Sequence, residues 1–169
     1  KGARYALARI KNVDAARSWL QSASITSAVA MKPPPSTAMQ VAFTAEGLKA
    51  LGISESVINS FSHEFVAGMT EPNRSRRLGD VENNAPSEWR WGGPGNVPHL
   101  LVMFFAKSEL LDGFVQDSTG SVWNEAFDVK WLYTSDLDGI EPFGFADGIS
   151  QPQIDWQRKE RQHGPDGIP

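Results

Sequence analysis

Apolar residues recur along the chain in patterns that predict four β-strands. Residues 38–44 and 127–134 alternate apolar and polar side chains with the period of two that is typical of a strand with one buried face. Residues 4–10 are rich in small and apolar side chains and also predict a strand. Residues 99–106 form a continuous apolar run, so we expect a strand that is buried on both faces.

Apolar residues at helical spacing predict helices between these strands. Asn12 can cap the first of them, and Thr44 or its neighbour begins a short one that ends at Gly52. We expect one further helix over 54–69 and another over 107–115.

Residues 71–97 differ from the rest, because they combine several Gly and Pro with many charged residues. Trp89 and Trp91 lie among them, which favours a long ordered loop. The resulting order of elements predicts a doubled β-α-β unit. We therefore expect a ferredoxin-like α+β fold with a four-stranded antiparallel sheet and a long inserted loop, in a single domain over 1–169.

The composition narrows the possible functions. The chain has 169 residues, a formal net charge of -4 and no cysteine, which excludes disulfides and thiolate chemistry. A general affinity for nucleic acid or anionic membranes is not indicated, and no apolar run approaches the roughly 20 residues of a membrane span. No targeting segment is visible. The chain begins directly on a strand-like segment and stops in a Gly/Pro loop, so we expect both ends to be truncated and leave the compartment open.

The stretch 144–152 presents the most distinctive chemistry. Asp147 lies between glycines, with Phe143 and Phe145 just before it. Glycine lets the backbone turn tightly and lets a bulky ligand approach, so this loop can hold a carboxylate against a flat apolar cofactor. A simpler alternative is a turn aspartate that bonds to its own loop, since Asp-Gly is a common turn pair.

This stretch resembles the GxxDG signature of the dye-decolorizing peroxidases, a family of heme enzymes. Four further segments resemble the same family in the same order along the chain: 41–48, 65–69, 78–80 and 89–92. The resemblance covers nearly the whole chain and implies one half of a protein with two ferredoxin-like halves and heme b between them. It also implies reduction of hydrogen peroxide coupled to oxidation of an organic reductant, such as a dye.

The resemblance further assigns roles to single residues. Asp147 matches the distal residue that acts as acid and base on peroxide. Gly148, Ile149 and Gln151 match positions that line the heme edge, and Phe145 either contacts the heme or packs behind the loop. The histidine that ligates the iron and the distal arginine are expected in the missing C-terminal half, beyond Pro169. This chain alone is therefore expected to be inactive and to bind heme weakly or not at all.

The three histidines are not expected to bind iron. His63 is predicted at a helix surface, His99 at a strand end with a satisfied ring, and His163 in a solvated polar run. We therefore expect no metal ligand in this chain. Asp136, Asp138 and Glu141 form an incomplete calcium-loop pattern and are interpreted as a solvated turn.

Arg74, Arg76 and Arg77 form a basic cluster with two interpretations. They can bind heme propionates or an anionic substrate, or they can pin the loop to Glu71, Asp80 or Glu82, which we favour. The aromatic residues can likewise relay electrons or simply pack; the candidates are Trp89, Trp91, Trp123, Trp131, Tyr133 and Trp156.

Two other functions remain as alternatives. The doubled β-α-β order also occurs in RNA-recognition domains, but the acidic balance and the missing basic residue before Phe143 argue against nucleic acid. The second is a non-catalytic ferredoxin-like module that dimerises or serves as a scaffold, and a homo-oligomer is compatible with either assignment.

Overall fold

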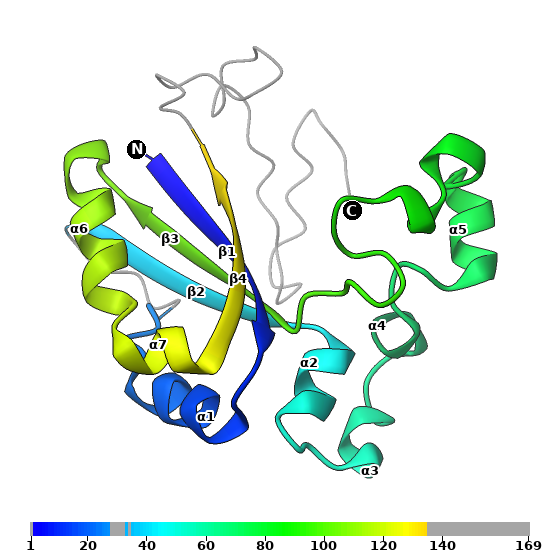
Figure 1. The fold of residues 1–169 in the computed structure, drawn as a ribbon, viewed down its shortest axis with the longest axis horizontal. Coiled ribbons are helices and arrows are strands. Elements are labelled where there is room, and N and C mark those ends of the chain that lie inside the picture. Colours follow the sequence, from blue (N-terminus) through cyan, green and yellow to red (C-terminus); the bar gives the residue numbers. More distant parts are fainter. Residues whose placement is uncertain (1, 28–32, 34, 135–169) are drawn as a thin grey trace, which may run out of the picture. The chain divides into compact units, whose positions relative to one another are not determined.

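The computed structural model describes residues 2–27, 33 and 35–134, and these contain one antiparallel sheet of four strands (Figure 1). The strands are β1 Gly2–Ile10, β2 Thr37–Phe43, β3 Leu100–Ala106 and β4 Phe127–Tyr133. Their order across the sheet is β2-β3-β1-β4, which places β1 and β3 at the centre. This arrangement confirms the predicted α+β class with a ferredoxin-like order of elements.

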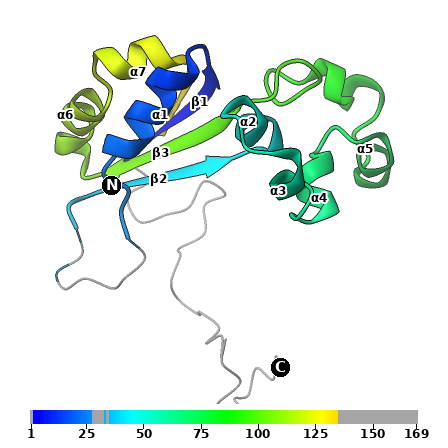
Figure 2. The ribbon, with the colours of Figure 1, turned by 90° about the horizontal axis from the view of Figure 1, so that it is seen from below.

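Three helices cover one face of the sheet, and Figure 2 shows them together on the same side. They are α1 Val13–Ser22, α6 Ser108–Ser118 and α7 Ser121–Ala126. Asn12 caps α1 as predicted, since its side-chain oxygen accepts the backbone N–H of Ala15 at 3.1 Å. The sequence did not predict α7, which has no side-chain cap to mark its start.

The register of the strands determines which side chains face these helices. Ala6 in β1 pairs with Val102 in β3 and with Trp131 in β4, so the three lie on the helix-covered face. Ala6 and Ala8 are fully buried. Because alanine adds little bulk above the sheet, the helices can pack close to the central strand.

An aromatic cluster fills the space between the helices and the sheet. The ring of Trp19 in α1 lies 4.8 Å from that of Trp123 in α7 and 5.6 Å from that of Phe127 in β4, both edge to face. The indole N–H of Trp19 donates to the Ser118 carbonyl at 2.9 Å, so its polar atom is satisfied. Burial of each large side chain contributes roughly 1.5–3 kcal/mol relative to exposure.

The prediction that β3 is buried on both faces is wrong. Its burial alternates: Phe104 is fully buried under the helices, whereas Phe105 on the other face is 36% exposed. We call this second face of the sheet the open face. In the described part of the chain, neither of the helices after β3 packs on this open face. Its apolar side chains are therefore partly accessible.

The chain between β2 and β3 forms a series of short helices. They are α2 Ala45–Ala50, α3 Glu55–Ile58, α4 His63–Ala67 and α5 Pro72–Leu78, followed by 3₁₀ turns at Glu82–Asn84 and Pro86–Glu88. Thr44 caps α2 as predicted, because its hydroxyl accepts the N–H of Gly47 at 3.0 Å.

The single helix expected over 54–69 is divided into α3 and α4. The hydroxyl of Ser60 donates to the Val57 carbonyl at 2.7 Å, and Ser62 accepts the N–H of Phe65 at 3.3 Å. Serine side chains thus replace the helical bonds at this point and start a new helix.

The long loop expected over 71–97 contains a helix that the prediction missed. Glu71 caps α5 by accepting the N–H of Arg74 at 2.8 Å, and Pro72 occupies the first turn. The helix ends at Gly79, whose φ of +80° is left-handed and suits glycine. These start and stop signals were present in the sequence but were outweighed by the Gly and Pro content of the whole segment.

None of the helices within the described ranges is long and apolar enough to cross a membrane.

Candidate functional site

The residues predicted to form the site lie outside the described residues. These are Asp147 with Phe145, Gly148, Ile149 and Gln151, and also the turn with Asp136, Asp138 and Glu141, as well as His163 and Trp156. Their roles stay predictions. The described residues include the sheet and the loops that precede this stretch in the sequence.

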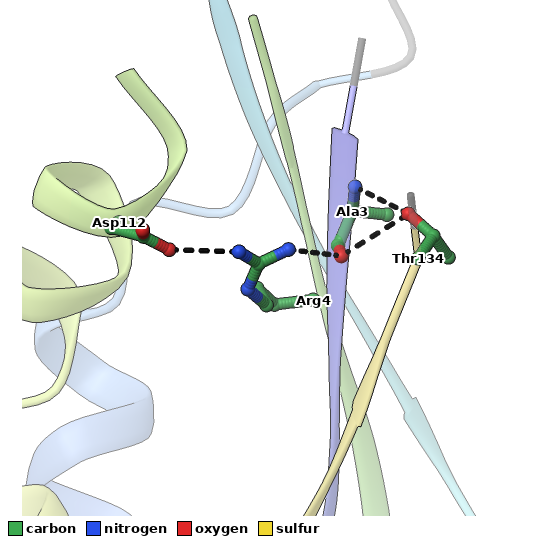
Figure 3. A network of polar contacts seen from close by, with 4 residues as sticks. All are labelled: Ala3, Arg4, Asp112 and Thr134. Atoms are coloured by element: carbon green, nitrogen blue, oxygen red, sulfur yellow. Dashed lines mark hydrogen bonds and ion pairs between the residues drawn. The ribbon is translucent and has the colours of Figure 1, made fainter. Parts of the chain in front are cut away.

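The last described residue, Thr134, is held to β1 by three hydrogen bonds, and Figure 3 shows the two at its hydroxyl group. Its hydroxyl oxygen accepts the N–H of Ala3 at 2.9 Å, and its backbone N–H donates to the Ala3 carbonyl at 3.3 Å. Beside it, Arg4 donates to Asp112 of α6 at 2.9 Å. The chain that continues toward Asp147, thirteen residues further on (147 − 134 = 13), therefore starts from a fixed point on the sheet.

The open face is the first candidate for a functional surface. Tyr5 packs edge to face against Phe105 at 6.0 Å, and Met103 pairs with Tyr5 on the same face. Leu132 of β4 also pairs with Tyr5, which makes the centre of this face continuously apolar. Such a surface suits a flat apolar group or another apolar protein surface.

A polar pocket of about 120 Å³ lies at one end of the open face. Arg9 and Lys130 line it from the strands, and Trp91 and Asn96 line it from the loop before β3. Arg9 donates to the Gly95 carbonyl at 2.6 Å, and Lys130 donates to a loop carbonyl at 3.1 Å. Asp128 lines the same pocket, so its lining combines two cations with one carboxylate beside an indole.

The sequence analysis missed this pocket, because its residues come together only through the register of the sheet. Leu7 pairs with Lys130, and Arg9 pairs with Asp128, so positions more than 100 residues apart along the chain share one wall. The alternation along each strand predicts which face of the sheet a side chain occupies, but it does not predict which side chains of other strands lie beside it.

The ring of His99 is engaged within the sheet, and His63 lies at the protein surface. His99 is half-buried just before β3, and its Nδ1 accepts the N–H of Ile10 at 3.0 Å. Partial burial lowers the pKa of this imidazole, and the nearby Arg9 guanidinium acts in the same direction. His63 is exposed at the start of α4. Both positions agree with the predictions. No group of three His, Asp or Glu suitable for a metal occurs in the described part of the chain.

The arginine cluster is partly a structural feature. Arg74 donates to the carbonyls of Glu64 and Gly68, at 3.0 and 3.1 Å, and so holds the end of α4. The Arg74 guanidinium therefore holds the loop, which is the interpretation we favoured. It bonds to backbone carbonyls, whereas the sequence suggested the carboxylates of Glu71, Asp80 or Glu82. Arg76 and Arg77 lie in the last turn of α5, where cations favour the negative end of a helix.

Among the described residues, some tryptophans are packed inside the protein and others are exposed to solvent. Trp123 is buried in the core, and the indole N–H of Trp89 donates to the Asn84 carbonyl at 3.0 Å. Trp91 differs, since it is 44% exposed and lines the polar pocket. Packing accounts for the first two, and Trp91 is the indole that a ligand on the open face could reach.

Two curated proteins match the sequence. A dye-decolorizing peroxidase of Mycetinis scorodonius is 31% identical over 134 residues, which is 75% of this chain and 24% of that protein. A dye-decolorizing peroxidase of Exidia glandulosa is 26% identical over 136 residues, covering 78% of this chain and 26% of the relative. The chain thus spans about a quarter of the length of the curated relatives it matches. No family model matches it.

Solved structures match the fold. The decolorizing peroxidase of Auricularia auricula-judae gives a TM-score of 0.70 at 22% identity, covering 95% of this chain and 37% of that chain. A dye-decolorizing peroxidase in complex with 2,6-dimethoxyphenol gives 0.65 at 24% identity, covering 89% of this chain and 35% of that chain. Together with the curated matches, they confirm the resemblance predicted from the sequence: the chain is related to the dye-decolorizing peroxidases and corresponds to a part of their length.

Proposed function

We propose that this chain is the N-terminal domain of a heme-dependent peroxidase that reduces hydrogen peroxide and oxidises organic substrates such as dyes. The observation that carries the proposal is the 31% identity over 134 residues to a dye-decolorizing peroxidase. The GxxDG-type stretch from Gly144 to Gly148 also supports it. Because the relatives are about four times longer, we assign the activity to a longer protein that contains this chain.

The open face fits one wall of a heme site. It is apolar at its centre, where Tyr5, Met103 and Phe105 meet. At one end Arg9 and Lys130 lie beside the single carboxylate of Asp128, which leaves an excess of one positive charge there. A heme likewise combines a flat apolar ring with carboxylates, and it supplies the redox-active iron at which peroxide reacts. The iron ligand has to come from elsewhere, because His99 is engaged by Ile10 and His63 is exposed.

Asp147 is the proposed distal acid and base. Hydrogen peroxide must lose a proton from one oxygen and gain one on the other as its O–O bond breaks. A carboxylate is ionised above about pH 4, so it can take the first proton and return it to the departing oxygen. The flanking glycines would let the backbone bring Asp147 close to the cofactor, with Gly148, Ile149 and Gln151 along its edge.

The test is Asp147→Asn in the complete protein. Asparagine nearly preserves size and hydrogen bonding but cannot accept the proton, so the reaction with peroxide should slow by about 10²–10⁴-fold while heme content changes little. Rapid mixing with peroxide at matched heme occupancy, followed through the Soret band, measures this rate. Asp14→Asn is the control, because it removes the same charge from an exposed position on α1. Equal rates in wild type and Asp147→Asn would make Asp147 a structural turn residue.

The competing function is a non-catalytic ferredoxin-like module that mediates dimerisation. It predicts no heme in the complete protein. Soret absorbance of the purified complete protein after addition of hemin separates the two assignments: a stoichiometric heme spectrum supports the peroxidase, and its absence supports the module.

A further inference from the structure

The segment Asn73-Arg74-Ser75 has the form Asn-X-Ser with a middle residue other than proline, which is the acceptor motif for N-linked glycosylation. Asn73 is the only asparagine in the sequence that is followed two positions later by serine or threonine. Because so short a motif also occurs by chance, its place in the fold decides whether it can carry a glycan.

The side chain of Asn73 lies at the protein surface, in the first turn of α5. Asn73 is exposed, and so are Pro72 before it and Arg76 and Arg77 after it on the same helix. Its Nδ2 donates to Oε1 of Glu71 at 3.1 Å, a contact between two side chains that is itself open to solvent. A bulky polar glycan can therefore project from Asn73 into water without displacing any part of the core.

A glycan on Asn73 is compatible with the cap of α5. The carboxylate of Glu71 accepts the backbone N–H groups of Asn73 and Arg74, at 3.1 and 2.8 Å, so the cap does not depend on the Asn73 side chain. The amide of asparagine has two N–H donors, and glycosylation uses one of them. The other can still donate to Glu71, so the helix can form in the same way with the glycan attached.

Ser75, the third residue of the motif, is hidden once the chain has folded. It is 7% exposed, and its hydroxyl donates to the Asp80 carbonyl at 2.6 Å. A transferase that reads the motif cannot reach this hydroxyl in the folded protein. Glycosylation of Asn73 therefore has to precede the folding of α5.

The order of the strands along the chain leaves time for this step. The helix α5 lies between β2 and β3, and the sheet is complete only with β4, which ends at Tyr133, 60 residues after Asn73 (133 − 73 = 60). At translation rates of about 5–20 residues per second, these residues take roughly 3–12 s to make. The motif is thus available on an unfolded chain for seconds before the sheet can be completed.

We propose that Asn73 is an N-glycosylation site, modified when the chain enters a eukaryotic secretory pathway and displayed on the exposed first turn of α5. The donor is a lipid-linked oligosaccharide pyrophosphate. Nδ2 of Asn73 forms a bond to the anomeric carbon of the sugar, the bond from that carbon to the pyrophosphate oxygen breaks, and the amide loses one proton as the lipid pyrophosphate leaves. This modification requires neither heme nor Asp147, so the proposal stands apart from the peroxidase assignment.

The test is expression of the complete protein in yeast behind an appended signal peptide. Digestion with peptide-N-glycosidase in heavy-oxygen water converts a glycosylated asparagine into an aspartate that carries the heavy isotope, so mass spectrometry of the peptides locates the site. We expect this label at Asn73 and loss of the whole glycan mass in Asn73→Gln. Ser75→Thr keeps the hydroxyl that the motif requires and should keep the glycan.

Asn83→Gln is the matched control. Asn83 is also exposed, but Ala85 stands two positions after it, so this variant should carry the same glycan as wild type. Protein retained in the cells with its signal peptide removed is analysed in the same way, so that the result does not depend on the secreted yield. The proposal is overturned if wild type shows no label at Asn73, or if Asn73→Gln keeps the same glycan mass.

Discussion

His99 joins β3 to β1 through both its ring and its backbone. Its Nδ1 accepts the N–H of Ile10 at 3.0 Å, and its own N–H donates to the Ala8 carbonyl at 2.8 Å. Only a neutral ring can accept this hydrogen bond at Nδ1. The lowered pKa of the imidazole, caused mainly by its burial, means that the folded state favours the neutral form.

We therefore expect the free energy of unfolding to decrease as the pH falls below about 6.5, the ordinary pKa of an unfolded histidine. In that range the unfolded chain binds a proton that the folded chain does not, so stability is lost toward the lowered pKa of His99. Urea unfolding across this pH range measures the slope. His99→Gln should reduce the slope, whereas His63→Gln, at an exposed position, is the matched control. An unchanged slope in His99→Gln would refute this role.

Gly47 allows α2 to approach the backbone before β3. A Cβ added at Gly47 would lie 1.8 Å from the carbonyl oxygen of His99, which is backbone and cannot move aside easily. We expect Gly47→Ala to destabilise the fold by about 1–3 kcal/mol. Gly113, inside α6, is the control: a Cβ there meets nothing within 4 Å. Gly113→Ala should stabilise by roughly 0.5–1 kcal/mol. Chemical denaturation of both variants measures the difference, and equal effects would contradict the close approach.

At the scale of elements, neighbouring side chains of β3 point to opposite faces of the sheet, one under the helices and one on the open face. Phe104→Ala should cost about 3–5 kcal/mol, because its ring is fully buried against Phe114 and Trp131. Phe105→Ala, one position along, should cost less than about 1 kcal/mol, because this ring is partly exposed on the open face. Thermal unfolding of the two variants compares them directly. Similar losses would mean that the open face is packed as tightly as the core.

Local patterns predicted the strands better than the helices. The bounds of β2, β3 and β4 differ from the predicted ones by a residue at each end at most, since their apolar runs are compact. The face-by-face burial of β3 was not predictable, because a run of apolar letters does not say whether the second face is covered by a helix. The break between α3 and α4 depends on serine hydroxyl bonds, which spacing alone does not reveal.

At the scale of the whole molecule, the sequence predicted the family resemblance and the fold, while the pockets depended on register. Asp147 was found because it stands in a short signature, and its role stays a prediction because it lies outside the described residues. Arg9 and Lys130 carry no signature, and Trp91 was identified only as an aromatic candidate within a segment that resembles the family. The three meet only when β1, β4 and the loop before β3 are assembled, so no local pattern could have identified the pocket.

These 169 residues alone are expected to take up hemin weakly or not at all. His99 is engaged and His63 is exposed, so neither offers the sheltered imidazole that a heme iron needs. Absorbance titration of the purified chain with hemin checks this, with the complete protein as the reference. Tight one-to-one uptake with a histidine-ligated spectrum would show that one of the three histidines had been misjudged.

The central place of β1 in the sheet also affects how the protein is made. Arg4 pairs with Tyr133, so β1 leaves the ribosome well before a partner strand that is 129 residues later (133 − 4 = 129). At translation rates of about 5–20 residues per second, this delay lasts roughly 6–26 s. During that time the nascent chain exposes the apolar side chains of β1 without the strand that will cover its edge. The sheet is therefore expected to fold only after β4 has emerged, and β1 benefits from chaperone protection until then.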